Sequence, residues 1–210
     1  MFRSISQERE RAKESVIAET IKKIEELPKD KGCIIVLVGK SSSGKTSIAK
    51  YVTDNFRYDN IVSHTTRPIR PGEQEGIDYY FIGDTAFDVM EQEEMFVETT
   101  KYRGWRYGIS KQELENKEFG IVVTDIVGVR NLKRNGIKHV SIYIERDDKD
   151  RFISSILRGD SITEIALRNE RDTACYQDIY SEVDYVIKND CEIEEMATKL
   201  LECVGEYLKK

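Results

Sequence analysis

The segment GKSSSGKT, residues 39–46, limits the possible folds more than any other stretch of the sequence. Two glycines separated by four residues and followed by a lysine and a hydroxyl residue form the P-loop pattern. The apolar, β-branched run CIIVLVG before it, Cys33–Gly39, predicts a strand buried on both faces. The stretch Thr46–Phe56 behind the loop opens as a helix. Strand, glycine loop and helix in this order predict a site for phosphate groups.

The chemistry of such a loop follows from its residue types. Glycines let backbone amides point at phosphate oxygens, and the helix that follows adds the positive end of its dipole. We expect Lys45 to reach the β and γ phosphates of ATP and the Thr46 hydroxyl to hold Mg²⁺. The residues expected to contact ATP here are Gly39, Ser41, Ser42, Ser43, Gly44, Lys45, Thr46 and Ser47. The alternative is a glycine-serine surface turn, which the buried strand disfavours.

Further apolar runs predict the rest of an α/β core. Buried strands are expected at Gly120–Asp125, Val140–Glu145 and Val183–Asp190. Helical stretches around Val127–Asn135 and from Lys149 onward separate them, which indicates βαβ units and a parallel sheet. A last helix that covers the sheet is expected from Ile193, Met196, Ala197, Leu200, Leu201 and Val204 at helical spacing.

The middle of the chain does not follow this alternation of strands and helices. Between Ile61 and Leu114, short polar and aromatic pieces alternate with turn residues. This pattern predicts a small, partly β subdomain inserted into the parallel core. Insertions of this kind often supply the pocket for a second substrate.

Length and composition exclude several classes of protein. A chain of 210 residues with 39% hydrophobic content suits one globular domain. A net charge of -6 argues against a general nucleic-acid binder. The four cysteines lack the spacing of zinc pairs, so we expect reduced thiols. With no signal peptide and no apolar run long enough to span a membrane, we expect a cytoplasmic protein.

The first 31 residues are densely charged and stand apart from the core. Val16, Ile17, Ile21 and Ile24 recur at helical spacing, which predicts an amphipathic helical extension that ends near Leu27-Pro28. Packing on the domain and contact with a second copy are both open. The chain is therefore expected to be a monomer or a homodimer.

The stretch SHTTRPIRPGEQEGIDYYFI, Ser63–Ile82, carries the signal for a second substrate. Arg67 and Arg70 bracket a proline that stiffens the turn. Two guanidinium groups held in this way make a fork for a dianionic phosphate. A solvated, charged loop is the other interpretation, and the residues alone leave both open.

At this segment the chain resembles guanylate kinases. The family carries a pattern like S-x-T-T-R-x-x-R-x-G-E-x-x-G-x-D-Y-x-F, which the chain matches from Ser63 to Phe81. The resemblance continues through FVETTKYRGWRYG (Phe96–Gly108) and DYVIKND (Asp184–Asp190), and it covers residues 33–205. It implies a guanylate kinase-like domain over residues 32–210, with a monophosphate-binding subdomain at about 60–115 and a helical lid at about 151–175.

The resemblance also implies roles for individual side chains. The residues that it assigns to the monophosphate of GMP are Arg67, Arg70, Tyr79 and Tyr107. Glu73 resembles an acidic residue that steadies this region. Glu98 resembles the residue that reads guanine, with Ser63 on the other edge of the base. A carboxylate accepts hydrogen bonds from N1–H and the 2-amino group of guanine, and adenine lacks both donors.

Two positions near the base and the metal depart from the family pattern. Ile109 stands where a serine or threonine is usual, so a hydroxyl near the base is missing, and Ser110 follows one residue later. Val123 replaces the first of two aspartates on its strand. Asp125 remains, and we expect it to help organise Mg²⁺ or its waters.

The lid matches the family in part. Arg158-Gly159 fits an Arg-Gly pair, Arg168 fits after a one-residue deletion, and Leu167 replaces a commonly basic neighbour. The resemblance implies that Arg158 and Arg168 neutralise charge on the transferring phosphoryl group and that Asn189 contacts the adenine of ATP. A solvated helix face is the other interpretation of these arginines.

The reaction that the resemblance implies is transfer of the γ-phosphoryl group from MgATP to GMP. The catalytic residues are then expected to be Lys45, Arg67, Arg158 and Arg168. Two alternatives are a kinase for a different or broader monophosphate, such as dGMP, and a non-catalytic module that binds a protein in the same groove. Such modules typically have degraded P-loops, which Lys45 and Thr46 argue against.

Overall fold

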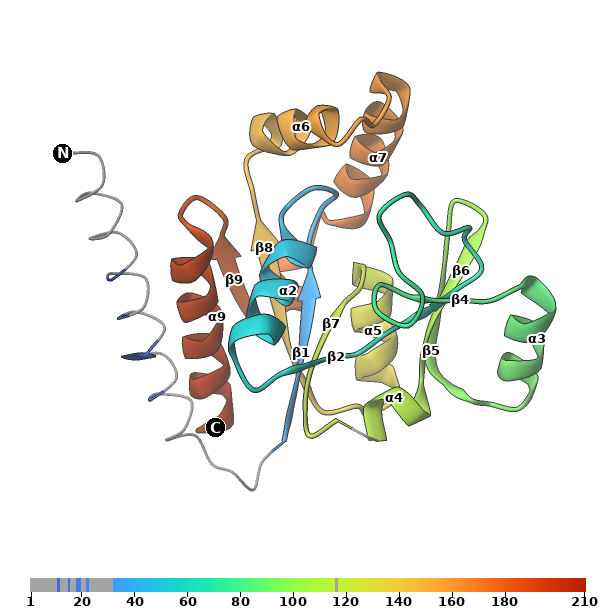
Figure 1. The fold of residues 1–210 in the computed structure, drawn as a ribbon, viewed down its shortest axis with the longest axis horizontal. Coiled ribbons are helices and arrows are strands. Elements are labelled where there is room, and N and C mark those ends of the chain that lie inside the picture. Colours follow the sequence, from blue (N-terminus) through green and yellow to red (C-terminus); the bar gives the residue numbers. More distant parts are fainter. Residues whose placement is uncertain (1–10, 12–14, 16–17, 20–21, 23–31, 116) are drawn as a thin grey trace.

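The computed structural model describes residues 11, 15, 18, 19, 22, 32–115 and 117–210. Its core is a parallel sheet with the strand order β2-β7-β1-β8-β9 (Figure 1). In that order the strands are Asp59–Asn60, Phe119–Val123, Cys33–Val38, His139–Glu145 and Tyr185–Lys188. The predicted parallel α/β core is confirmed: β1 and β9 lie within the apolar runs assigned to strands, and β7 and β8 each begin one residue before theirs.

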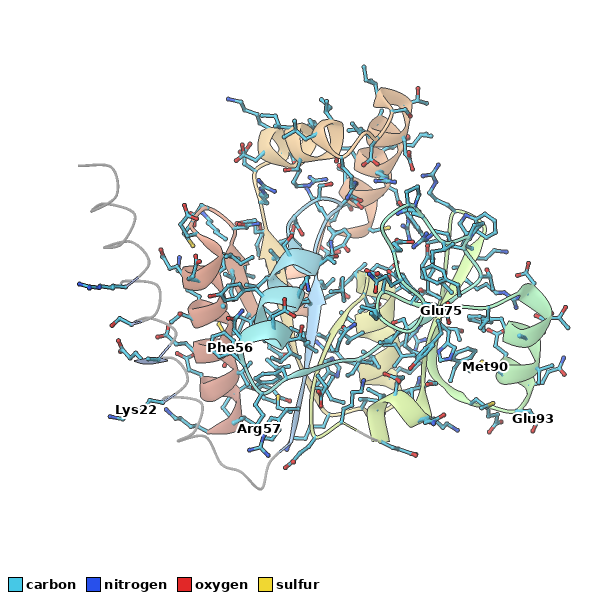
Figure 2. All side chains as sticks on the ribbon, viewed as in Figure 1. Lys22, Phe56, Arg57, Glu75, Met90 and Glu93 are labelled. Carbon is cyan, nitrogen blue, oxygen red and sulfur yellow. The ribbon has the colours of Figure 1, made fainter. Side chains whose placement is uncertain are left out.

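The helices that cover this sheet are α2 (Lys45–Asn55), α5 (Ile126–Arg134), α8 (Ile179–Glu182) and α9 (Ile193–Leu208). Ile35 and Leu37 of β1 pack into an apolar layer with α2 and α9. Val36 and Val38 face the other way, into a second layer with α5 and α8. Because both faces of β1 are buried, its sequence is apolar throughout. Phe56, which follows the last residue of α2 (Figure 2), packs against the first layer.

A second, smaller sheet lies beside the core, with the strand order β4-β3-β6-β5. Its strands are Tyr80–Phe81, His64–Thr65, Trp105–Ser110 and Phe96–Tyr102, and the helices α3 (Asp84–Gln92) and α4 (Lys111–Glu115) accompany it. The expected mixture of short strands and turns in this part of the chain is therefore present.

Side-chain amides of α5 fasten the small sheet to the core. Asn131 Nδ2 donates to Thr99 O at 3.0 Å, and Asn135 Nδ2 donates to Val97 O at 2.6 Å. Both acceptors lie on β5, at the edge of the sheet. The otherwise open edge strand is thus paired where it meets the core.

Beyond the core, α6 (Asp148–Leu157) and α7 (Ile162–Cys175) lie past the carboxyl end of β8 (Figure 1). Asp147 and Ser161 cap them, accepting hydrogen bonds from Lys149 N–H and Glu164 N–H. The predicted helical stretch after Lys149 is confirmed, but it is interrupted. Gly159 has a φ of 90°, a left-handed conformation that ends α6.

The predicted amphipathic extension over residues 1–31 falls almost entirely outside the described residues. Within the part that is described, no helix is both long and apolar enough to cross a membrane. The cysteines at positions 33, 175, 191 and 203 are free thiols.

Candidate active site

The P-loop lies at the carboxyl end of β1, the edge of a parallel sheet at which ligands bind. Gly44 has a φ of 98° and begins α2. A Cβ there would lie 2.4 Å from Asn189 Nδ2, and a Cβ at Gly39 would lie 2.6 Å from Ile144 O. Both positions of the motif therefore require glycine, because β8 and the segment after β9 pack directly against the loop.

Lys45 folds over this loop. Its Nζ donates to Gly39 O at 2.7 Å and to Lys40 O at 2.9 Å. Burial lowers the pKa of Lys45 to about 8, and the nearby Asp172 carboxylate opposes that decrease. The ammonium group is thus held against loop carbonyls, at the place from which it is predicted to reach the phosphates of ATP.

The three loop serines and the hydroxyls after Lys45 differ in what they contact. Ser41 N–H donates to Asp172 Oδ2 at 2.6 Å, and Ser43 N–H donates to Lys40 O at 3.2 Å. Ser42 Oγ lies 2.8 Å from Ser155 Oγ. The hydroxyls of the two exposed residues Thr46 and Ser47, in the first turn of α2, make no hydrogen bond with any described residue.

Asn189 and Asp125, two residues predicted to contact ATP and Mg²⁺, are engaged within the protein. Asn189 Nδ2 donates to Ser43 O at 2.8 Å, so this amide supports the P-loop. Asp125 Oδ1 caps α5, accepting from Gly128 N–H at 3.1 Å, and its Oδ2 accepts from Arg171 at 3.2 Å. Among the described residues, no group of three histidine, cysteine or acidic side chains is arranged to hold a metal. The adenine and Mg²⁺ roles stay predictions.

The turn between β3 and β4 forms a rigid guanidinium-carboxylate unit. Arg67, only 6% exposed, binds Glu73 through two hydrogen bonds of 2.8 and 3.0 Å. Glu73 also accepts from Arg70 N–H at 2.8 Å. Burial alone would raise the pKa of Glu73, but these hydrogen bonds hold it below its ordinary value. Glu73 therefore fixes the turn that carries both arginines.

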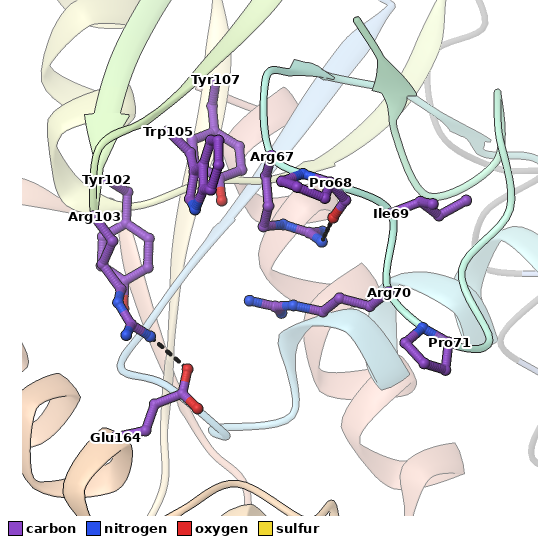
Figure 3. Close-up of a pocket in the computed structure, with 10 residues that line it drawn as sticks. All are labelled: Arg67, Pro68, Ile69, Arg70, Pro71, Tyr102, Arg103, Trp105, Tyr107 and Glu164. Carbon is purple, nitrogen blue, oxygen red and sulfur yellow. Dashed lines mark hydrogen bonds and ion pairs between the residues drawn. The ribbon is translucent and has the colours of Figure 1, made fainter. Parts of the chain in front are cut away.

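Arg67, Arg70 and Tyr107 line one cavity of about 390 Å³ (Figure 3). The exposed Arg70 guanidinium makes no hydrogen bond or ion pair with any described residue, so it is free for an anion. Tyr79 lies against this cavity, its ring 5.3 Å from the Arg67 guanidinium and 5.8 Å from the Tyr107 ring. Burial raises the pKa of Tyr79 to about 12, so its hydroxyl stays protonated and can donate.

Sequence reasoning missed the far wall of this cavity. Tyr102, Arg103 and Trp105 come from the turn between β5 and β6, and Glu164 comes from α7 (Figure 3). Arg103 forms an ion pair with Glu164, so the small sheet and α7 touch. The mixture of basic and aromatic residues in KYRGWRYG was the only available signal.

Glu98 and Ser63, the predicted readers of guanine, are both buried, but Glu98 does not line the cavity of Arg67. It opens instead on a second cavity of about 770 Å³, which Thr99 and Asn131 also line. Glu98 is 5% exposed, and its Oε2 has no hydrogen-bond partner among the described residues. Burial, with a smaller contribution from the charge of Asp125, raises the pKa of Glu98 to about 7.

Neither Ile109 nor Ser110 supplies the hydroxyl that the family pattern has near the base. Ile109 is opposite Glu98 in the β5–β6 register, is 1% exposed and packs into the second apolar layer. Ser110 Oγ accepts a hydrogen bond from Glu113 N–H at 3.3 Å, so this side chain supports α4. The side of Glu98 that faces Ile109 is therefore apolar.

The lid arginines are paired with carboxylates of their own segment. Arg158 and Arg168 both bind Asp160, the latter at 2.9 Å. Arg168 also binds Glu164 at 2.5 Å. Either arginine would have to exchange a carboxylate for a phosphate oxygen in order to act on ATP.

Comparison with known proteins gives one consistent result. A family model described as guanylate kinase matches residues 31–207. A guanylate kinase of Legionella pneumophila (strain Paris) is 34% identical over 178 residues, which are 80% of this chain and 83% of the relative. One from Buchnera aphidicola subsp. Acyrthosiphon pisum is 36% identical over 168 residues, 76% and 81% of the two chains. A crystal structure of guanylate kinase from Anaplasma phagocytophilum superposes with a TM-score of 0.66 at 26% identity, covering 87% of this chain and 89% of that one.

Proposed function

The chain belongs to the guanylate kinase family, and from that premise we propose that it transfers the γ-phosphoryl group of MgATP to GMP, giving GDP and ADP. The observation that carries the choice of acceptor is Glu98. A buried carboxylate with an unpartnered oxygen is costly, and such atoms are rare in folded proteins unless a ligand satisfies them. Guanine offers two adjacent N–H donors to a carboxylate, and adenine offers none at those positions.

The acceptor phosphate is proposed to bind between Arg67, Arg70, Tyr79 and Tyr107. Arg70 supplies an unpaired positive charge, and Arg67 is oriented by its two bonds to Glu73. A phosphate dianion suits two convergent guanidinium groups better than a single carboxylate does. Ser63 and Glu98 would then select the base.

The donor is proposed to bind in the P-loop, with Lys45 exchanging its loop carbonyls for the β and γ phosphates of ATP. Thr46 is the residue that fits Mg²⁺, because its exposed hydroxyl has no partner among the described residues. Mg²⁺ held there would supply positive charge that neutralises part of the charge of the phosphates. Asp125 is proposed to act on the waters of that ion, and Asn189 to contact adenine.

The reaction requires little more than alignment and neutralisation of two phosphates that repel each other, because the acceptor oxygen is already anionic. Arg158 and Arg168 are proposed to leave Asp160 and bind the transferring group. Closing of the lid over the small sheet would exclude water and so prevent hydrolysis of ATP. The contact between Arg103 and Glu164 lies where the two parts meet.

Free nucleotides as substrates and a net charge of -6 favour a cytoplasmic enzyme that does not bind nucleic acid.

The experiment that tests the proposal is ADP formation from MgATP with each common ribo- and deoxyribonucleoside monophosphate, with a control lacking acceptor. We expect turnover with GMP and little with AMP. Strong turnover with another base would replace GMP by that acceptor. No turnover with any acceptor, while ATP still binds, would overturn the kinase assignment and favour a binding module.

A further inference from the structure

A buried ion pair between α6 and α7, the two helices of the predicted lid, binds the P-loop. Arg151 of α6 is 2% exposed and Asp172 of α7 is 6% exposed. Arg151 and Asp172 are 3.2 Å apart, and Arg151 also bonds to Asp148. Neither Arg151 nor Asp172 belongs to the residues that the proposed reaction uses.

The pair binds both backbone groups of one loop residue. Ser41 N–H donates to Asp172 Oδ2 at 2.6 Å, and Ser41 O accepts from Arg151 Nε at 2.9 Å. The same carboxylate oxygen accepts from Arg151, which closes the arrangement. The peptide groups on either side of Ser41 are therefore oriented by α6 and α7.

Two further contacts bind neighbouring residues of the loop. One turn after Asp172, the Tyr176 hydroxyl donates to Gly39 O at 3.0 Å. On α6, one turn after Arg151, Ser155 Oγ lies 2.8 Å from Ser42 Oγ. Three residues in the first half of the P-loop are thus bound by lid helices far along the sequence.

A contribution to folding stability does not by itself explain why charged residues occupy these two positions. Replacing a buried ion pair by apolar side chains of similar size is often neutral or stabilising, so packing does not require charges here. The hydrogen bonds of these charges end on the P-loop backbone instead. With Ser41 N–H directed at Asp172 and Ser43 N–H at Lys40 O, the amides at the start of α2, from Gly44 onward, are the ones directed to phosphate.

We propose that Arg151 and Asp172 are positioning residues for the nucleoside triphosphate. They fix the Ser41 peptide groups so that the amides at the start of α2, from Gly44 onward, face the β and γ phosphates. They also join α7, which carries Arg168, to the donor site. The inference rests on the proposed function and adds residues that set affinity for the donor without touching it.

The deciding experiment uses the full chain and the double variant Arg151→Met with Asp172→Leu. This variant leaves no unpaired buried charge, so we expect its melting temperature to stay close to that of the wild type. We expect the Kd for a non-hydrolysable ATP analogue, measured by calorimetry without acceptor, to rise at least about 10-fold. KM for ATP should rise with it, and KM for GMP should not change.

Two single variants refine this test. Asp172→Ala removes the acceptor of Ser41 N–H and should weaken binding of the analogue. Asp172→Asn keeps an acceptor oxygen and should restore part of that binding. Asp184→Ala is the matched control, because Asp184 accepts from Ser141 N–H at 2.7 Å within the same sheet but away from the loop. It should lower the melting temperature and leave the Kd for the analogue unchanged.

A folded double variant that binds the analogue and uses ATP like the wild type would overturn the proposal. An equal rise in KM for ATP and for GMP would do the same, since it would indicate a general loss of structure. The calorimetric measurement of analogue binding needs no acceptor nucleotide. A wild type that binds the analogue but phosphorylates no monophosphate would therefore contradict the proposed function and leave the role of the pair to be decided by binding.

Discussion

The donor and acceptor halves of the candidate site differ in how their polar atoms are satisfied. In the donor half, Lys45 binds loop carbonyls, Asp172 binds Ser41 N–H, and Asn189 binds Ser43 O. In the acceptor half, the Arg70 guanidinium makes no hydrogen bond with a described residue, and Glu98 has a buried oxygen without a partner among the described residues. The donor loop is thus shaped by the protein itself, whereas the acceptor half carries groups that only a ligand completes.

This difference predicts opposite consequences for stability. Removing one member of a polar contact in the donor half, while its charged partner stays buried, should lower affinity and stability together. Removing an unpartnered group from the acceptor half relieves a cost of burial, so activity should fall while stability is kept or improved. The following variants test that contrast.

The largest effect is expected from Lys45→Met, which removes the charge at the centre of the donor loop. We expect kcat to fall at least about 10³-fold, because this charge stabilises the transferring phosphoryl group. Steady-state ADP formation with GMP measures it. Lys50→Met is the control, since Lys50 is on the same helix and forms an ion pair with Asp54 at an exposed site. Near-normal turnover in Lys45→Met would refute the donor assignment.

Within the acceptor half, Arg67 and Arg70 allow a matched comparison. Arg70→Ala should raise KM for GMP about 10- to 100-fold, because the phosphate loses a charge-assisted hydrogen bond. The melting temperature should stay unchanged. Arg67→Ala should raise KM similarly and also lower the melting temperature, because Glu73 then loses its partner. A KM for GMP unaffected by Arg70→Ala would place the phosphate elsewhere.

The pH dependence of stability tests the cost of burying Glu98. Its pKa is raised to about 7 in the folded protein from an ordinary value near 4.5, so the folded state binds the proton more tightly. The contribution of Glu98 to the free energy of unfolding is then fully present below about pH 4.5 and is lost as the pH rises through about 7. Glu98→Gln should gain up to about 3 kcal/mol over the wild type at pH 8 and nothing near pH 4. Urea unfolding at both pH values measures this, and an equal difference at both would exclude the buried charge as its cause.

The smallest effect is expected where the small sheet meets the lid. Arg103 and Glu164 are partly exposed, and exposed ion pairs contribute about 0.2–1 kcal/mol. Arg103→Ala should therefore change kcat/KM for GMP less than about 5-fold and leave the melting temperature unchanged. Activity assays and thermal unfolding check both. A loss approaching that of Lys45→Met would make Arg103 a direct ligand of the nucleotides.

The two halves also differ in how far the sequence predicted them. The P-loop and β1 are contiguous, so residue type and order were enough to predict the loop, its strand and its helix. The acceptor residues could be named only through the family resemblance, because arginines in a polar turn do not by themselves distinguish a phosphate fork from a solvated loop. Glu98 and Ile109 lie opposite each other only because β5 and β6 pair, and the sequence alone does not give that register.

Contacts between distant segments were beyond sequence reasoning. Asp172 and Ser41 are 131 positions apart, and nothing in either local stretch indicates that they meet. Arg103 and Glu164 meet across 61 positions for the same reason. The break between α6 and α7 at Gly159 was not predicted, and the pairing of Arg158 and Arg168 with Asp160 depends on how the chain turns there.

The central claim is that a buried carboxylate selects guanine, and one measurement tests it most directly: the ratio of kcat/KM for GMP to that for AMP in the wild type and in Glu98→Gln. We predict a ratio of at least about 10³ in the wild type, since a buried polar reader rejects a base that leaves it unpaired. We predict that Glu98→Gln lowers this ratio at least about 10-fold while the protein remains folded. A wild-type ratio near unity, or a ratio that the substitution leaves unchanged, would contradict the account.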